Sequence, residues 1–182
     1  MKLGIALLRT IVGALFMGHG LQKLAGWFGG HGLDATGQAF EGMGLRPGRR
    51  HATAAGASET LGGALLAAGL MTPLGAAMIT GAMATAIRQV HASNGPWVTE
   101  GGYEYNLVLI AAVFALTDVG PGALSLDAAR GRDTWGPGWA LAQLAAGVAG
   151  SAAVLSTAQA PAPAPPQSPS PVGSGEADAA AA

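Results

Sequence analysis

The sequence predicts an all-α membrane protein, in which a transmembrane four-helix bundle is followed by a fifth C-terminal transmembrane helix. The first observation is composition: charged residues make up 10% of the 182 residues and hydrophobic residues 50%, whereas globular proteins carry about 25% charged residues. The second is that apolar residues gather in five runs, and the third is that glycine and alanine fill those runs. So few charges cannot cover a soluble globule, and disordered chains are polar and charged. A lipid bilayer is the environment that fits.

Composition also excludes several kinds of chemistry. The chain has no cysteine, which excludes disulfides, thiol redox chemistry, iron–sulfur clusters and cysteine–zinc sites. Its formal charge of −1 provides no basic surface for nucleic acid. A cleaved signal peptide is not favoured, because Arg9 interrupts the first apolar run and no Ala-x-Ala site precedes Gly26. No metal site is predicted.

Five segments approach the length of a membrane span, which needs about 17–25 mainly apolar residues. They are residues 3–24, 52–71, 74–90, 103–119 and the charge-free 139–155. Thr72-Pro73 makes a tight break between the second and third segments. Accordingly, residues 1–130 are predicted as the four-helix membrane domain and residues 137–157 as the fifth helix.

The connections differ from one another. Residues 25–51 are predicted as a long glycine-rich loop that ends in the basic residues Arg46, Arg49 and Arg50. Residues 91–102 form a turn sequence with the interfacial residue Trp97. Residues 158–182 are rich in proline, alanine and serine, contain no lysine or arginine, and are predicted as a disordered tail.

Small residues predict close helix packing in the second segment. Gly56 and Gly63 are seven residues apart, as are Gly62 and Gly69. In lipid, helices persist despite glycine, and small residues let neighbouring helices approach closely. Each pair therefore predicts a packing seam; the alternative is a general bias toward glycine and alanine.

Alternating helix direction places most polar side chains near one membrane surface. We call the side where the chain begins side A and the opposite side B. At a rise of 1.5 Å per residue, His19 lies about 7 Å and Glu59 about 10 Å below the side B surface. Lys23, Arg88, His91, Glu104 and Asn106 fall nearer the same surface, whereas Arg9 and Asp118 are left alone toward side A.

These residues form a candidate site. A charge at the centre of a membrane helix costs about 2.5–3.5 kcal/mol, so Glu59 needs a partner, and His19 at a similar depth is predicted to pair with it. His19 and Glu59 are the candidate catalytic residues. The candidate cofactor-binding residues are Lys23, Arg88, Asn106 and Glu104. The structural alternative is that the same residues only hold the bundle together, with the long basic side chains reaching out to the membrane surface.

Three motifs resemble the DoxX family of small bacterial multi-pass membrane proteins. They are the HG-x-x-K element from His19 to Lys23, the Glu59-Thr60-Leu61-Gly62-Gly63 segment, and the GPG-x-x-S-x-D element from Gly120 to Asp127. The resemblance covers residues 3 to about 130. It implies a four-helix bundle in the bacterial plasma membrane and a link to membrane redox chemistry, since the namesake relative is a subunit of a thiosulfate:quinone oxidoreductase. The fifth segment and the tail depart from the common length.

Two functions follow as hypotheses. The first is an integral membrane subunit of a quinone-linked oxidoreductase, with quinone as the candidate cofactor, His19 and Glu59 exchanging protons, and a partner protein supplying electrons. The second is a non-catalytic scaffold that docks a soluble redox enzyme. A transporter is less favoured because the chain shows no inverted repeat. A haem held by His19 and His91 is also less favoured, because both histidines lie toward the same end of the bundle. A homo-oligomer is compatible with either function.

Overall fold

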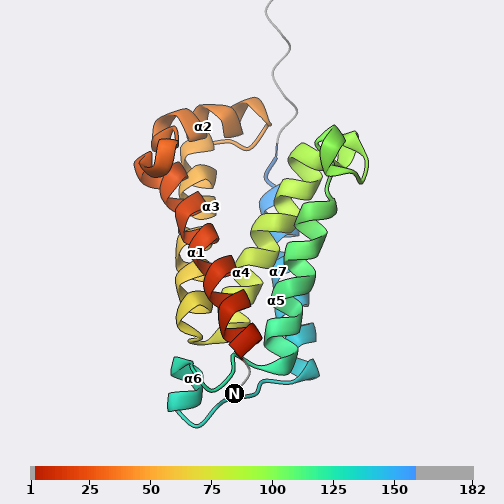
Figure 1. Cartoon of the computed structure of the whole chain (residues 1–182). Helices are drawn as coiled ribbons and strands as arrows, with labels where there is room; N and C mark the ends of the chain where they lie inside the picture. The colour runs from red at the N-terminus through yellow and green to blue at the C-terminus, as the bar shows by residue number, and fades with distance from the viewer. Residues whose placement is uncertain (1–2, 159–182) are drawn as a thin grey trace, which may run out of the picture.

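The computed structural model describes residues 3–158, and this part of the chain is helical without strands. The predicted disordered tail lies outside the described residues except for Ala158. The five long helices are α1 (Leu3–Ala25), α3 (Gly48–Ala68), α4 (Thr72–Ala86), α5 (Glu104–Val119) and α7 (Pro137–Leu155). Successive long helices run in opposite directions, with the short helix α2 (Gly32–Gly42) across one end and α6 (Leu126–Ala129) at the other (Figure 1). The α2 end corresponds to side B.

The long helices coincide with the five predicted segments, so the all-α prediction is confirmed. Within the described residues, two helices have both the length and the apolar character of a membrane crossing: α1 and α7. The helix α4 has 15 residues and continues as a five-residue π-helical turn, η2 (Ile87–His91), while α5 has 16 residues. The helix α3 is long enough at 21 residues, but its first turns are polar.

Glycine sets the distance between α1 and α3, which pack along their length. A Cβ atom added to Gly13 would lie 2.5 Å from the carbonyl oxygen of Gly63, and one added to Gly20 would lie 2.5 Å from that of Gly56. The predicted Gly56/Gly63 seam is therefore confirmed, because no larger side chain fits between these backbones. On another face of α3, Gly62 lies against Gly75 of α4.

The predicted Gly62/Gly69 packing seam is wrong with respect to Gly69. This glycine ends α3 in the left-handed conformation, with φ of 61°. Its N–H donates to the carbonyl of Leu66, and the N–H of Leu70 donates to that of Leu65. This pattern closes helix termini and favours glycine, so Gly69 builds the turn into α4 and does not contribute to a helix seam.

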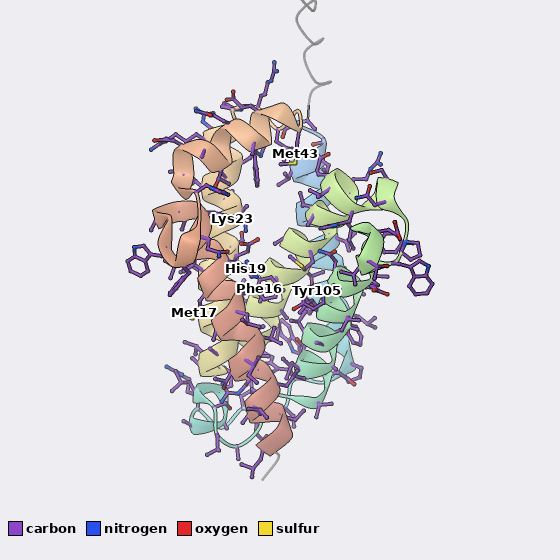
Figure 2. All side chains as sticks on the ribbon, turned by 45° about the horizontal axis from the view of Figure 1, so that its top comes forward. Phe16, Met17, His19, Lys23, Met43 and Tyr105 are labelled. Atoms are coloured by element: carbon purple, nitrogen blue, oxygen red, sulfur yellow. The ribbon has the colours of Figure 1, made fainter. Side chains whose placement is uncertain are left out.

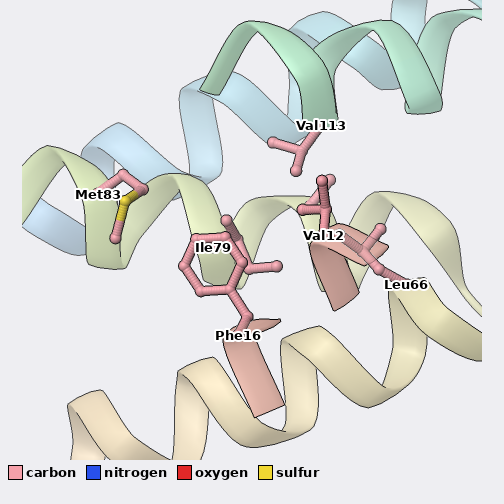
Figure 3. Close-up of a cluster of buried hydrophobic side chains, with 7 residues drawn as sticks. Val12, Phe16, Leu66, Ile79, Met83 and Val113 are labelled. Atoms are coloured by element: carbon pink, nitrogen blue, oxygen red, sulfur yellow. The ribbon is translucent and has the colours of Figure 1, made fainter. Parts of the chain in front are cut away.

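The hydrophobic core lies midway along the bundle, where α1, α3, α4 and α5 meet (Figure 3). Its buried members are Val12, Phe16, Leu66, Ala76, Ile79, Met83 and Val113. The fifth helix α7 is also part of the bundle and packs on α4 and α5. Its buried face carries polar groups: the Thr80 hydroxyl donates to Gln143 Oε1 at 3.1 Å, and the Thr85 hydroxyl to Ser151 Oγ at 2.9 Å.

The predicted loop at residues 25–51 contains a helix, so that prediction is wrong in part. Helix α2 packs on the start of α3. Gly37 allows the close approach, since a Cβ there would lie 3.1 Å from Arg49 Cα. The N–H of Gly48 donates to Glu41 Oε1 at 3.1 Å, and Asp34 forms an ion pair with Arg49. The high glycine content suggested a loop, but here glycine serves helix packing.

Candidate functional site

A cavity of about 610 Å³ lies between α1 and α3 on one side and α4, α5 and α7 on the other. It occupies the half of the bundle toward α2, and the core residues Phe16 and Met83 form part of its wall. Figure 2 shows His19 and Lys23 directed into the opening beneath Met43. Most of the lining is apolar. The polar side chains that line it are His19, Lys23, His51, Ser58, Glu59, Thr85, Gln89, His91, Tyr105, Asn106 and Ser151.

An ion pair between Lys23 and Glu59 joins α1 to α3 at the wall of the cavity. The Lys23 Nζ atom lies 2.6 Å from Glu59 Oε2, and the two side chains are 26% and 7% exposed. Gly20 lies one turn before Lys23, directly against Gly56 on α3. Because the helices touch there, the long lysine side chain reaches the buried carboxylate.

The predicted pairing of His19 with Glu59 is wrong. His19 Nδ1 lies 3.0 Å from Gln22 Oε1, and Gln22 Nε2 donates to the Phe28 carbonyl at 3.2 Å. His19 is thus held by its own helix and by the turn that follows it. Both His19 and Glu59 line the cavity, so the structure places them in one site without direct contact.

The other four candidates divide into two groups. Lys23 and Asn106 line the cavity, and buried Asn106 contacts Met83 Sδ at 3.4 Å. Arg88 is exposed and does not line the cavity. Glu104 accepts a hydrogen bond from the Val98 N–H at 2.9 Å, in the connection before α5. The prediction that Arg88 and Glu104 belong to the same cluster is therefore wrong.

Several polar residues that line the cavity were not predicted as site residues. The π-helical turn at residues 87–91 changes the register of the helix end, so that Gln89 and His91 line the cavity instead of Arg88. His51 and Tyr105, which the sequence did not mark as site residues, also line it. No local pattern marks the π-turn, and only the packed helices show which residues face inward.

Arg9 is not alone at side A, contrary to prediction. It is buried, and its Nε atom donates to the Pro121 carbonyl at 3.1 Å and Nη1 to the Leu66 carbonyl at 3.2 Å. Its guanidinium also reaches the carbonyls of Ala67 and Leu124. Since the last carbonyls of a helix lack intrahelical partners, Arg9 closes the end of α3 and holds the segment before α6 against it.

Asp127 closes the beginning of α4 in the complementary way. Its carboxylate accepts hydrogen bonds from the N–H groups of Met71 and Thr72 at 2.8 and 3.1 Å. It also accepts from the Thr72 hydroxyl at 2.9 Å and from Trp135 Nε1 at 3.0 Å. Arg9 and Asp127 therefore cap the two sides of the α3–α4 turn, one binding carbonyls and the other N–H groups.

Comparison with known families decides what kind of domain contains this cavity. Residues 4–92 match the DoxX family model. Residues 4–92 form a domain of the DoxX family. Together with the two span-length helices, this membership indicates a membrane protein. No curated protein and no solved structure matches the chain.

The DoxX match includes part of the site. It contains Arg9, the Lys23–Glu59 pair and the cavity walls from α1, α3, α4 and η2. It ends before α5, so the Gly120–Asp127 element and the fifth helix lie outside the matched residues. Asn106 and Tyr105 thus complete the cavity from beyond the matched part of the DoxX protein.

We expect the Lys23–Glu59 pair to show energetic coupling. Removing one partner of a fully buried pair costs about 3–5 kcal/mol, and less beside an open cavity. The double variant Lys23→Met/Glu59→Gln should therefore lose clearly less stability than the two single variants added together, in unfolding measurements in detergent. The control is the double variant His19→Ala/Glu59→Gln, whose loss of unfolding free energy should equal the sum of the two single variants within about 0.5 kcal/mol. Additive effects for Lys23 and Glu59, with coupling between His19 and Glu59, would instead support the His19–Glu59 pair that the sequence suggested.

The stability of the side A turn should depend on pH through Asp127. Burial raises the pKa of this carboxyl, but the hydrogen bonds from Thr72, Met71 and Trp135 lower it, and the net pKa lies below its usual range. Because its pKa is lower in the folded state, Asp127 stabilises the fold at pH values above its unfolded-state pKa of about 3.9. This contribution is lost as the pH falls toward the lower folded-state pKa. The difference in unfolding free energy between wild type and Asp127→Asn should be constant near neutrality and shrink below about pH 4. A difference that persists through the acid range would contradict an ionised Asp127.

Proposed function

We propose that this DoxX protein is a multi-pass subunit of a membrane redox system in the bacterial plasma membrane, and that its cavity binds the head group of a quinone. The observation that carries the proposal is the Lys23–Glu59 ion pair on the wall of a largely apolar cavity. Its volume of about 610 Å³ falls within the range of about 300–1,000 Å³ that is usual for small-molecule sites.

The apolar outer surface of the bundle supports several membrane crossings. The helices α3, α4 and α5 lie side by side with α1 and α7 in the bundle (Figure 1). Large apolar side chains on them point outward and are exposed, among them Leu61, Leu74, Leu107 and Val108. Apolar surface of this extent suits lipid and would be unusual on a soluble monomer. We therefore include all five long helices in the membrane.

The residues present fit a quinone. Its ring and tail need apolar surroundings, which Phe16, Leu109 and the glycine and alanine residues of α4 and α7 provide. Its carbonyl oxygens need hydrogen-bond donors, which Lys23 and Asn106 carry and which His19 Nε2 supplies when the imidazole is protonated. Reduction to the quinol takes up two electrons and two protons. In this proposal Glu59 and His19 exchange the protons, and a partner protein supplies the electrons.

Glu59→Gln is the direct test. The change keeps the side-chain shape but removes the carboxylate that holds the Lys23 ammonium at the cavity wall. The charged hydrogen bond from Lys23 to a quinone carbonyl, worth about 1.5–3 kcal/mol, would then lose its positioning. We expect the affinity for a short-tailed benzoquinone to fall about 10- to 100-fold, measured by equilibrium dialysis on protein in nanodiscs. Glu104→Gln is the matched control, because Glu104 bonds to the Val98 N–H outside the cavity. Unchanged binding in Glu59→Gln would contradict the quinone site.

The scaffold function is the second candidate, and one observation favours it. Arg46 and Arg50 are exposed near the start of α3, at the α2 end, where they could contact an acidic partner. If the protein is a scaffold, Arg46→Glu/Arg50→Glu should release a redox enzyme from isolated membranes while Glu59→Gln leaves it attached. Retention of the enzyme in Arg46→Glu/Arg50→Glu, together with loss of quinone binding in Glu59→Gln, would favour the quinone site.

A further inference from the structure

The seam between α1 and α5 is closed toward side A and open toward side B. On the closed half, Val12 of α1 and Val113 of α5 belong to the same buried cluster (Figure 3). Toward side B, the residues that face the seam from both helices line the cavity. From α1 they are Leu15, Phe16 and His19, and from α5 they are Tyr105, Asn106 and Leu109.

Two of these residues lie at the same time on the cavity wall and on the outer surface. Leu15 and Tyr105 are each 53% exposed and both line the cavity. Figure 2 shows Phe16 of α1 and Tyr105 of α5 at a similar height along the bundle. The cavity therefore reaches the lateral face of the bundle, which faces lipid if α1 and α5 cross the membrane.

The polarity of the lining side chains increases from the α1–α5 seam toward the Lys23–Glu59 pair. Of the six seam residues, Leu15, Phe16 and Leu109 are apolar and Tyr105 is aromatic, while His19 and Asn106 carry polar groups. The Lys23–Glu59 pair lies on the side of α1 that packs against α3, where the glycine contacts bring the helices together. A ligand with a polar head and a long apolar tail matches this order, because its head meets the ion pair while its tail remains beside the lipid chains.

We propose that the α1–α5 seam is a lateral portal, through which a long-tailed amphiphile enters the cavity from the bilayer. The proposal rests on the proposed function in one respect, since it identifies the ligand as a quinone with an isoprenoid or alkyl tail. It adds the route of entry and the position of the tail. A water-soluble ligand would instead enter at the α2 end, past Met43.

The experiment uses the full chain in nanodiscs and two photoreactive probes. One is a benzoquinone with a decyl tail that ends in a diazirine, and the other is a fatty alcohol with the same diazirine tail. Labelled residues are identified by mass spectrometry, and a tailless benzoquinone serves as competitor. The variant Leu15→Trp narrows the portal. Leu8→Trp is the matched control, because Leu8 lies on the same helix face about 10 Å toward side A and does not line the cavity.

We expect the quinone probe to label the seam around Leu15, Tyr105 and Leu109. Labelling should fall about tenfold in Leu15→Trp and remain unchanged in Leu8→Trp. Leu15→Ala should retain labelling, which separates narrowing of the portal from loss of folding.

The remaining outcomes separate this inference from the proposed function. Labels near Met43 and Val154, displaced by the tailless quinone, would overturn the portal and leave the quinone site intact. Equal labelling of the seam by both probes, without displacement by the tailless quinone, would support the portal and reject the quinone. Absence of specific labelling by either probe would overturn the portal.

Discussion

Asp127→Ala is expected to lower the free energy of unfolding by about 3–5 kcal/mol, because it leaves two buried and two partly buried donors without an acceptor. Those donors are the N–H groups of Met71 and Thr72, the Thr72 hydroxyl and the Trp135 indole N–H. Each unsatisfied buried group costs about 1–3 kcal/mol, and relaxation of the turn recovers part of the sum. The loss would be seen as a lower melting temperature of the detergent-solubilised protein.

Asp133→Ala is the control for Asp127→Ala. Asp133 is exposed in the same connection between α5 and α7, so its removal should change the free energy of unfolding by less than about 0.5 kcal/mol. Asp127→Asn should fall between the two, because an amide oxygen can still accept from the N–H groups of the α4 start. Equal effects of the two alanine variants would show that the α3–α4 turn does not depend on the carboxylate.

Gly13→Ala and Gly63→Ala are expected to destabilise the protein by about 1–3 kcal/mol each, the usual cost of overpacking. The new Cβ atoms would lie 2.5 Å from carbonyl oxygens on the facing helix, so α1 and α3 would have to separate. Separation would also draw Lys23 away from Glu59. We therefore expect both variants to weaken quinone binding, measured as for Glu59→Gln.

Gly18→Ala tests the same substitution on the same helix without the clash. A Cβ atom at Gly18 meets nothing within 4 Å, and alanine has a higher helix propensity than glycine. This variant should unfold at the wild-type temperature or above it, and it should bind quinone as the wild type does. If Gly18→Ala and Gly13→Ala were equally unstable, the cause would be glycine content and not the contact between the two helices.

Much of the fold could be predicted from local properties of the sequence. The five apolar runs have the length of helices, and the turns between them contain glycine and proline, so the order of the long helices followed from the sequence. Alternating helix direction then placed His19, Lys23, Glu59 and Asn106 at one end of the bundle. The Gly56/Gly63 spacing identified the face of α3 that packs on α1, because close packing in lipid selects small residues.

The partner of each polar group was decided only by the tertiary structure. Depth along the helices favoured His19 as the partner of Glu59, but the close approach at Gly20 and Gly56 brings Lys23 to the carboxylate. Arg9 and Asp127 are far apart in the sequence, and nothing local to either residue shows that both cap the α3–α4 turn. Sequence periodicity determines which face of a helix is apolar and how deep a residue lies. Which side chains meet across helices depends on interhelical distance and rotation, and these are set by the packing of the whole bundle.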